Sequence, residues 1–502
     1  MRLCTLPLLA LAACGLAAGT NVHTQSAPFK VVCYYGSWAV YRPGDGRFDV
    51  EDIDPLLCTH AIYTFAGLDA ATHTIKSLDP WNDLYDNYGK GAYLRFTALK
   101  ERNPQLKTLL AIGGWNEGSE KYSEMTASPE HRKIFVASCV EFLRKYGFDG
   151  LDLDWEYPAQ RGGKATDRDN FGHLVRELSD ALVPQDLLLT AAVGQSRATI
   201  DGAYNMLQLA EYLDIINVMA YDYHGTWDPF TGHVAPLYGS SQDIKHGGGY
   251  EDLNVNFTIH YYMQGGVPAS KLAMGLPTYG RGFLLDDPTR HGLYAPARQP
   301  MPACPYTRDA GFCGFAEICQ MLGEGGWTSV TDAEQQSLYM YKGDVWVGYD
   351  DLVSIKRKVD LIRSLGLGGG MVWSLETDDL HNRCGLGTAL PFLNAVWTEL
   401  NGDIPTPSPA PPEPTTSPGP TPGPTPSPTP GPTPSPPGPT PTRVCQKEGL
   451  NPDPQNKCSA IFYECEHVGA NWRVTEMECA PGLVFDSQHD ACSWPQQTPE
   501  CQ

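Results

Sequence analysis

The stretch FDGLDLDWEY at residues 148–157 is the part of the chain from which fold and chemistry can best be predicted. If it forms a β-strand, its side chains alternate, so that Asp152, Asp154 and Glu156 share one face and apolar side chains occupy the other. Repulsion and loss of hydration oppose the burial of three carboxylates on one face unless some keep their protons. A solvated acidic edge strand is one explanation of the pattern. The other is a buried relay of carboxyl groups that share protons and end in a general acid.

Seven further apolar runs of strand length indicate how this strand is embedded. The eight runs lie at 30–35, 60–67, 106–115, 148–157, 187–194, 215–223, 271–282 and 370–376. Most are separated by segments long enough for amphipathic helices, for example 130–146, 167–183 and 353–365. This alternation predicts an α/β fold, a (β/α)8 TIM barrel, with a doubly wound sheet as the alternative. In a TIM barrel the chemistry lies at the carboxyl ends of the strands.

Composition divides the chain into three parts. Residues 28–401 carry the predicted barrel, and a long gap at about 284–347 with three cysteines and many turn residues predicts an α+β insertion after strand seven. Residues 402–443 consist almost entirely of Pro, Thr, Ser and Gly, a composition typical of an extended linker with nothing to bury. At about 3.1 Å per residue such a linker could reach on the order of 100 Å. Residues 444–502 form a small cysteine-rich module.

The N-terminus predicts secretion. Arg2 precedes an apolar run at 6–16 and then small residues, which is the pattern of a signal peptide over residues 1–19. A membrane-retained N-terminus and a bacterial lipoprotein site at Cys14 are alternatives. No later apolar segment approaches the roughly 20 residues of a membrane-spanning helix, so no membrane association is expected.

Charge and motifs restrict the partners. The net charge of −22 argues against nucleic acid, whose phosphates would be repelled, but is compatible with a neutral polymer. We find no spacing of metal ligands and no phosphate-binding loop, so neither a metal nor a cofactor is expected. Asn256-Phe257-Thr258 is a sequon, which predicts a glycoprotein.

Two of the 15 cysteines lie in the predicted signal peptide, and the others form two groups. Seven lie between Cys33 and Cys384; because seven is odd, one thiol is expected to stay unpaired, and Cys139 is the candidate. Six lie between Cys445 and Cys501, separated by 12, 6, 13, 12 and 8 residues. Six cysteines in so short a segment of an exported chain predict a disulfide scaffold, for which the sequence alone allows 15 pairings.

Three motifs carry a resemblance to a known family. DGLDLDWE at 149–156 resembles the signature of the family 18 glycoside hydrolases, the chitinases. AIGGW at 111–115 is similar to the family's Ser-x-Gly-Gly motif, from which it departs at Ala111, and MAYD at 219–222 matches a third motif. These motifs end the third, fourth and sixth predicted strands. The resemblance extends over most of residues 28–400 and implies a barrel that hydrolyses chitin.

The spacing of the acids restricts the mechanism. Asp154 and Glu156 share one strand face, about 6.6 Å apart, so they cannot easily flank a sugar as the two carboxylates of many glycosidases do. Only Glu156 is placed to protonate a leaving oxygen, and the substrate's own 2-acetamido oxygen is the candidate nucleophile.

The resemblance implies a role for each of these residues. Glu156 would donate the proton and then act as the base that activates water. Asp154 would orient the acetamido group, Asp152 would take a shared proton, and Tyr221 would donate to the acetamido oxygen. The reaction would retain configuration without a glycosyl-enzyme bond, the substrate-assisted route.

Aromatic side chains near the predicted strand ends are candidates for stacking on sugar rings, with core packing as the alternative for each. They are Tyr34, Trp38, Trp81, Trp115, Tyr157, Trp227, Tyr279 and Trp373, with Arg281 nearby. The resemblance implies that Trp373 floors the sugar beside the cleaved bond and that Asp222 supports the same sugar. It also implies substrate contacts from Pro80, Gly113, Gly114, Asn116, Met219 and Ala220. His224 is expected to be structural, because the mechanism requires no imidazole.

The cysteine-rich tail resembles the peritrophin-A (family 14) chitin-binding domain. This resemblance implies the pairs Cys445–Cys465, Cys458–Cys501 and Cys479–Cys492. Trp472 and Trp494 are candidates for sugar stacking, and a module for some other partner is the alternative. In the large domain, the family 18 resemblance implies Cys33–Cys58 and Cys319–Cys384, and proximity in the sequence suggests Cys304–Cys313.

The predicted function is that of a secreted, monomeric, endo-acting chitinase that binds chitin and chitooligosaccharides and hydrolyses their β-1,4 bonds. One alternative is a catalytically inactive, lectin-like chitin-binding relative, against which the presence of Glu156, Asp154 and Asp152 counts. A second is an endoglycosidase acting on N-linked glycans, which would leave the tail poorly explained.

Overall fold

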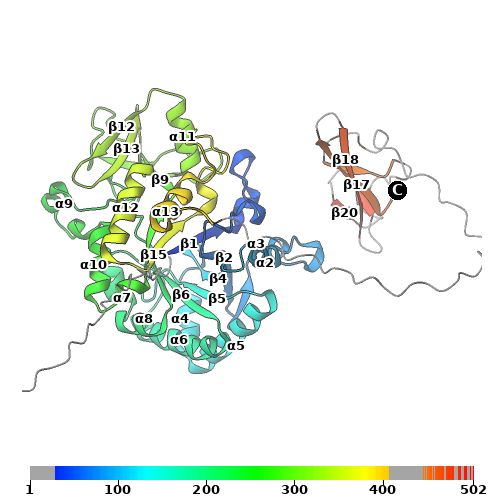
Figure 1. Cartoon of the computed structure of the whole chain (residues 1–502), viewed down its shortest axis with the longest axis horizontal. Helices are drawn as coiled ribbons and strands as arrows, with labels where there is room; N and C mark the ends of the chain where they lie inside the picture. Colours follow the sequence, from blue (N-terminus) through cyan, green and yellow to red (C-terminus); the bar gives the residue numbers. More distant parts are fainter. Residues whose placement is uncertain are drawn as a thin grey trace, which may run out of the picture. The chain divides into compact units, whose positions relative to one another are not determined.

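The computed structural model describes residues 29–405 and, with gaps, parts of 445–501. The predicted signal peptide at 1–19, the linker from 406 to 443 and Trp494 lie outside the described residues. The chain forms two compact units, Met1–Ala410 and Pro411–Gln502, and each is described by itself (Figure 1).

Eight parallel strands close into a barrel in the first unit. They are β1 (Lys30–Gly36), β2 (His60–Asp69), β4 (Lys107–Gly113), β5 (Gly150–Asp154), β6 (Leu188–Val193), β7 (Ile215–Val218), β8 (Leu272–Pro277) and β15 (Gly369–Trp373). Hydrogen-bonded neighbours follow the order β1-β15-β8-β7-β6-β5-β4-β2, and pairing of β1 with β2 closes the ring. A short strand, β3 (Thr74–Ser77), pairs antiparallel with β2. The predicted (β/α)8 barrel is confirmed, and the doubly wound alternative is wrong.

Helices occupy the connections and surround the barrel (Figure 1). They are α1 (Pro80–Asp83), α2 (Ala92–Thr97), α3 (Leu99–Arg102), α4 (Glu120–Ala127), α5 (Pro129–Tyr146), α6 (Asp167–Leu182), α7 (Arg197–Ala203), α8 (Met206–Tyr212), α9 (Ser241–His246), α10 (Val255–Gln264), α12 (Leu352–Leu365) and α13 (Pro391–Asn401). Local signals set their ends. In α5, the Ser128 side chain accepts from the N–H of His131, Pro129 takes the first position, and Gly147 ends the helix in a left-handed conformation.

Two apolar layers separate the inside of the barrel from its outside. Inside, Val32, Leu109, Ala111 and Met371 pack around Tyr34. Outside, the leucines of β5 pack with the inward faces of the surrounding helices. Because side chains alternate along β5, the leucines point to the helices and the aspartates point into the barrel.

The insertion begins earlier than predicted. The predicted strand 271–282 is two strands, because β8 ends where Pro277 pairs with Trp373 and a proline cannot donate a further ladder hydrogen bond. The chain then enters an antiparallel six-stranded sheet, which spans 279–349 rather than 284–347. Its strands are β9 (Tyr279–Leu285), β10 (Ala297–Pro300), β11 (Phe312–Gly314), β12 (Thr328–Asp332), β13 (Ser337–Lys342) and β14 (Val345–Tyr349), accompanied by α11 (Phe315–Gly323).

Disulfides brace both units. The first unit contains Cys33–Cys58, Cys304–Cys313 and Cys319–Cys384, which are the expected pairs, and Cys139 is buried with a free thiol. The second unit contains Cys445–Cys465 and Cys458–Cys501; Cys479 is also disulfide-bonded, but the side chain of its expected partner Cys492 lies outside the described part.

The second unit consists of two small sheets. A three-stranded sheet contains β16 (Gly449–Pro452), β17 (Ile461–Val468) and β18 (Asn471–Glu478), and a two-stranded sheet contains β19 (Val484–Asp486) and β20 (Ala491–Ser493). Trp472 packs, partly buried, beside Tyr463 and Cys465. Across the described residues of both units, no helix is long and apolar enough to cross a bilayer.

A buried ion pair on α12 generates a stability prediction. The Lys358 ammonium, completely buried, pairs with the equally buried Asp350, which also accepts from the Ser354 hydroxyl at 2.7 Å. Lys358→Met should cost about 3–5 kcal/mol of unfolding free energy, because it leaves a buried carboxylate without its partner. Lys356→Met on the same helix removes only a partly exposed pair with Glu399 and should cost less than about 1 kcal/mol. Urea unfolding of both variants measures the difference; equal costs would contradict the prediction.

Candidate active site

The row of acids lies at the carboxyl end of β5. Asp152 and Asp154 are almost completely buried on the strand, and Glu156 follows two residues after its end, partly exposed. The strand is shorter than the predicted 148–157, because its pairing with β4 ends at Asp154 and its pairing with β6 ends at Leu153. Since β5 lies between β4 and β6 in a closed barrel, the solvated edge strand is wrong.

Asp152 is the most strongly hydrogen-bonded of the three acids. It accepts from the Tyr34 hydroxyl at 2.8 Å, the Thr190 hydroxyl at 2.5 Å and the Asn217 amide at 3.2 Å. Burial nevertheless raises the pKa of Asp152 to about 6, although its three donors act in the opposite direction. Asp152 can therefore hold or release a proton near neutral pH.

Asp154 lies between two other carboxyl groups. Its Oδ1 is buried and has no hydrogen-bond partner in the described structure. Burial, followed by the charges of Glu156 and Asp152, holds the pKa of Asp154 well above its usual range. The Asp154 Oδ1 is the one carboxylate oxygen among the buried side-chain atoms without a partner in the described residues, so it can accept a hydrogen bond from a ligand.

Glu156 is the acid at the rim of the barrel. Burial raises the pKa of Glu156 to about 7, and the charge of Asp222 adds to this, whereas Tyr157 and Arg161 lower it. A general acid is most effective when its pKa lies near the working pH. The arrangement can therefore supply a proton at the carboxyl end of β5.

Gly113 and Gly114 hold the backbone at the end of β5. The N–H of Gly114 donates to the Asp154 carbonyl oxygen at 2.7 Å, and a Cβ on Gly113 would lie 2.1 Å from that same oxygen. Both glycines have positive φ, of 119° and 85°. They were predicted to contact a substrate; the structure places them, buried, against the backbone that carries the acids.

The 219–222 motif follows the end of β7. The Tyr221 hydroxyl contacts only the weakly accepting Met371 Sδ, at 3.7 Å, among the described residues. Asp222 accepts from both Nε and Nη2 of Arg281, at 2.8 and 2.6 Å, and from the Tyr279 hydroxyl at 2.8 Å. The tyrosine is thus left with an available donor, whereas Asp222 is fixed by the first strand of the insertion.

The remaining two residues of this motif, Met219 and Ala220, are buried in different apolar clusters. Met219 belongs to the apolar cluster inside the barrel, while Ala220 is completely buried among residues outside it. Their predicted substrate contacts stay predictions.

Trp373 forms an aromatic floor at the end of β15. Its ring centroid lies 5.6 Å from that of Tyr34, 6.0 Å from Phe65 and 6.3 Å from Trp38. Trp38 in turn stacks on Phe65. Three strand ends, those of β1, β2 and β15, thus meet in one aromatic group next to Tyr34, which contacts Asp152.

Three of the other predicted aromatic side chains are exposed. Trp81, Trp115 and Trp227 present large apolar surface to solvent, which disfavours core packing as their role. Trp81 stacks with Tyr41, and Trp227 lies 5.4 Å from the Arg281 guanidinium. Pro80 and Asn116 are also exposed, and Tyr157 is partly exposed beside Glu156.

His224 contacts groups other than Asp152, Asp154 and Glu156. It is buried, its Nδ1 lies 2.9 Å from Asp228 Oδ2, and its ring stacks on Tyr250. This placement agrees with the structural role expected for it.

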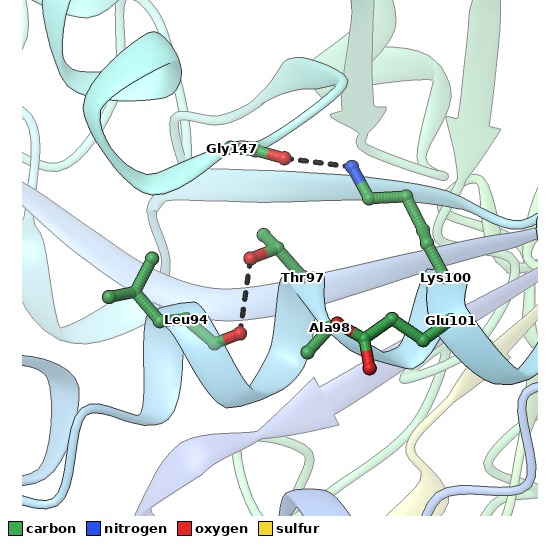
Figure 2. A pocket seen from close by; sticks show the side chains of 6 residues that line it. All are labelled: Leu94, Thr97, Ala98, Lys100, Glu101 and Gly147. Carbon is green, nitrogen blue, oxygen red and sulfur yellow. Dashed lines mark hydrogen bonds between the residues drawn. The ribbon is translucent and has the colours of Figure 1, made fainter. Parts of the chain in front are cut away.

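An open depression at the opposite end of β5 is not a candidate site. It is lined by Leu94, Thr97, Ala98, Lys100, Glu101 and Gly147 (Figure 2). Lys100 is already engaged there with the Gly147 carbonyl at 2.8 Å and with Asp149, which precedes β5, at 2.9 Å. The side chains of Thr97 and Lys100 are thus satisfied locally, and the depression is separated from Glu156 by the length of β5.

Several residues of the site were missed from the sequence. Thr190 and Asn217 interrupt the apolar runs LLTAAV and IINV, and a polar residue in a buried strand is a signal that could have found them. Phe65 and Arg161 carry no comparable local signal, because their importance comes from neighbours distant in the sequence.

A comparison with protein families agrees with this geometry. The model of the glycosyl hydrolases family 18 matches residues 30–378. The chain belongs to this family. Residues 445–501 match the chitin binding peritrophin-A domain, so the family 18 barrel is followed by a chitin-binding module.

Proteins similar to this chain include some named as chitinases and one described as a pseudo-chitinase. "Probable chitinase 2" of Drosophila melanogaster is 46% identical over 398 residues, which are 76% of this chain and 79% of that protein. The crystal structure of Ostrinia furnacalis Group IV chitinase in complex with allosamidin matches with a TM-score of 0.71 at 43% identity, over 74% of this chain and 98% of that one. Human YKL-39, described as a pseudo-chitinase with retained chitooligosaccharide binding, matches at 0.68 and 36% identity, over 74% and 99%.

The raised pKa of Asp154 predicts a pH-dependent gain in stability on its removal. A carboxyl whose pKa is raised in the folded state destabilises the protein once it ionises, so this cost is absent at low pH and present at high pH. Asp154→Asn should therefore be more stable than the wild type by about 0.5–2 kcal/mol at pH 8 and show no gain at pH 4. Thermal unfolding at both pH values measures this.

Asp149→Asn is the matched control. Asp149 accepts from the N–H and hydroxyl of Thr108, at 2.7 and 3.0 Å, and pairs with Lys100. Its replacement should lower stability at pH 8, opposite to Asp154→Asn. A loss of stability in both variants would contradict the assignment of Asp154 as a strained, ligand-seeking group.

Proposed function

We propose that the chain is a secreted chitinase that hydrolyses β-1,4 bonds between N-acetylglucosamine units by a retaining, substrate-assisted mechanism. The observation that carries the proposal is the row Asp152, Asp154 and Glu156, whose pKa values are all raised, with exposed tryptophans, Trp38 and Trp115, following β1 and β4. Family membership supports chitin as the polymer.

The first step would form an oxazolinium ion. Protonated Glu156 donates its proton to the glycosidic oxygen, and the acetamido oxygen of the substrate attacks the anomeric carbon as the leaving sugar departs. Asp154 accepts a hydrogen bond from the acetamido N–H with its unpartnered oxygen, and Tyr221 donates to the acetamido oxygen. The positive charge that develops on the ring nitrogen is stabilised by the Asp154 carboxylate as its proton moves to Asp152.

The second step would restore the enzyme. The Glu156 carboxylate removes a proton from water, which attacks the anomeric carbon from the side that the leaving sugar vacated. The bond between that carbon and the acetamido oxygen breaks, and the proton on Asp152 returns to Asp154 as the charge on the ring nitrogen is lost. Two successive inversions give net retention, and Glu156 regains its proton.

The tail supports action on an insoluble polymer outside the cell. A tethered chitin-binding module would raise the effective concentration of the barrel at the polymer surface. Disulfides distributed over both units fit an oxidising compartment. The proposal includes that the protein is a monomer and that it cleaves bonds within the polymer rather than at its ends.

A chitin-binding protein without activity is the second candidate function, because a pseudo-chitinase is among the structural relatives. The two functions differ in whether a proton donor stands at the position of Glu156. This chain has glutamate there, together with both aspartates.

Replacement of the proton donor tests the proposal. Glu156→Gln should still bind chitin oligomers but hydrolyse them at least about 100-fold more slowly, since general acid catalysis contributes 10²–10⁴. Glu101→Gln, the same change at the other end of the barrel, is the control and should keep the wild-type rate. Rates are measured by chromatography of the products, and NMR of fresh products should show the retained anomer. Inverted products, or equal rates for the wild type and Glu156→Gln, would refute the mechanism.

Removal of the tail tests the role of the second unit. A chain that ends after Gly402 should lose several-fold in the rate on crystalline chitin and stay within about twofold on short oligomers, because only the tethering is lost. Release of soluble sugar from both substrates is the measurement. A comparable loss on the oligomers would mean that the tail acts on the barrel itself.

A further inference from the structure

The loop that follows β5 is anchored in a fixed conformation. Asp167, completely buried, accepts from the N–H of Lys164 and from the Ser123 hydroxyl, both at 2.7 Å. Ala159 and Arg161 in this loop have φ of 64° and 50°. Side chains other than glycine adopt such conformations only where surrounding contacts hold them. The loop therefore presents the Arg161 side chain in a defined place.

The Arg161 guanidinium joins two loops of the site. Its Nη1 donates to the carbonyl oxygen of Trp115 at 2.7 Å and to that of Glu156 at 3.0 Å. Its central carbon lies 3.5 Å from the centroid of the Trp115 ring, so the guanidinium covers one face of the indole. Trp115 is still 58% exposed, which leaves the other face open.

We propose that Arg161 is a positioning residue of the hydrolytic reaction, which fixes the open face of Trp115 as a stacking surface for a sugar and holds a positive charge at the backbone carbonyl of Glu156, the proton donor. The inference rests on the proposed function, in which a sugar stacks on Trp115 and Glu156 donates the proton. The Arg161 side chain thereby links the position of the sugar on Trp115 to the acid strength of Glu156. A lysine would supply the charge without the planar fork that stacks and bridges.

Several other charged or titratable groups face Glu156. They are Asp154 on β5, Tyr157 next to it, Tyr204 at the end of α7, Tyr221 and Asp222 after β7, and Tyr279 on β9. Asp152 and Arg281 act one group further away, on Asp154 and on Asp222. Among them Asp222 raises the pKa of Glu156, whereas Arg161 lowers it. The charge of Arg281 is directed to Asp222 through two hydrogen bonds. Removal of the Arg161 charge should therefore change the pKa of Glu156 more directly than removal of the Arg281 charge.

The test compares Arg161→Met and Arg161→Lys in the full chain. In Arg161→Met, the alkaline limb of the pH profile of kcat/KM on chitin oligomers should move to higher pH, because loss of the cation raises the pKa of Glu156. The shift should be about half a pH unit, since a charge exposed to solvent is screened by water and salt. Oligomer affinity, measured by calorimetry in the Glu156→Gln background, should fall about two- to fivefold as the stacked platform loosens. With Lys, the limb should stay near that of the wild type while affinity falls as with Met.

Lys164→Met is the matched control, because it removes one positive charge from the same loop and contacts Asp167 through its backbone rather than its side chain. It should change neither the limb nor the affinity. If Arg161→Met leaves both unchanged, or if Lys164→Met moves the limb equally, the inference is overturned while wild-type hydrolysis keeps the proposed function intact. If the wild-type chain does not hydrolyse chitin oligomers at all, the proposed function fails instead.

Discussion

Three carboxyl groups in line at the end of a barrel strand cannot all be ionised, because each loses hydration and repels its neighbours. The three acids of the site are accommodated in three different ways. Asp152 is surrounded by three donors, Asp154 keeps an oxygen without a partner, and Glu156 stands at the rim where it meets solvent. The pKa of each is raised, and this readiness to hold a proton is what makes the row chemically useful.

Two charged pairs elsewhere in the first unit show the opposite arrangement. Lys358 and Asp350 are buried together, and Arg132 reaches Glu177 through two hydrogen bonds of 2.9 Å. These groups find their partners within the protein, as buried charges usually must. Asp154 departs from that pattern, because its Oδ1 is the one carboxylate oxygen among the buried, unpartnered side-chain atoms of the described residues. Such a departure from local satisfaction is typical of a functional site.

The insertion completes the site from one side. Its first strand, β9, begins immediately after β8 and carries both Tyr279 and Arg281, which fix Asp222. Phe312 on β11 stacks on Tyr279 at 4.5 Å, beside the Cys304–Cys313 disulfide. The antiparallel lobe is thus part of the wall around the acids rather than a separate appendage.

Much of this protein could be predicted from the sequence, because the deciding patterns are local. The alternation in FDGLDLDWEY predicts that three acids share one face, and the eight apolar runs predict the eight barrel strands. The six closely spaced cysteines predict that the tail is a disulfide scaffold. Strand ends were predicted less well, since β5 stops where its neighbours stop pairing and β8 stops at Pro277.

Only the tertiary structure decided which distant groups meet the acids. Tyr34, Thr190 and Asn217 come from three other strands, and Arg161 acquires its place by stacking on a tryptophan 46 residues away. Closure of the barrel brings these side chains within hydrogen-bonding distance, and burial then shifts the pKa values. Proton affinity depends on surroundings of this kind, so the sequence determines which acids are present and the fold determines how strongly each holds its proton.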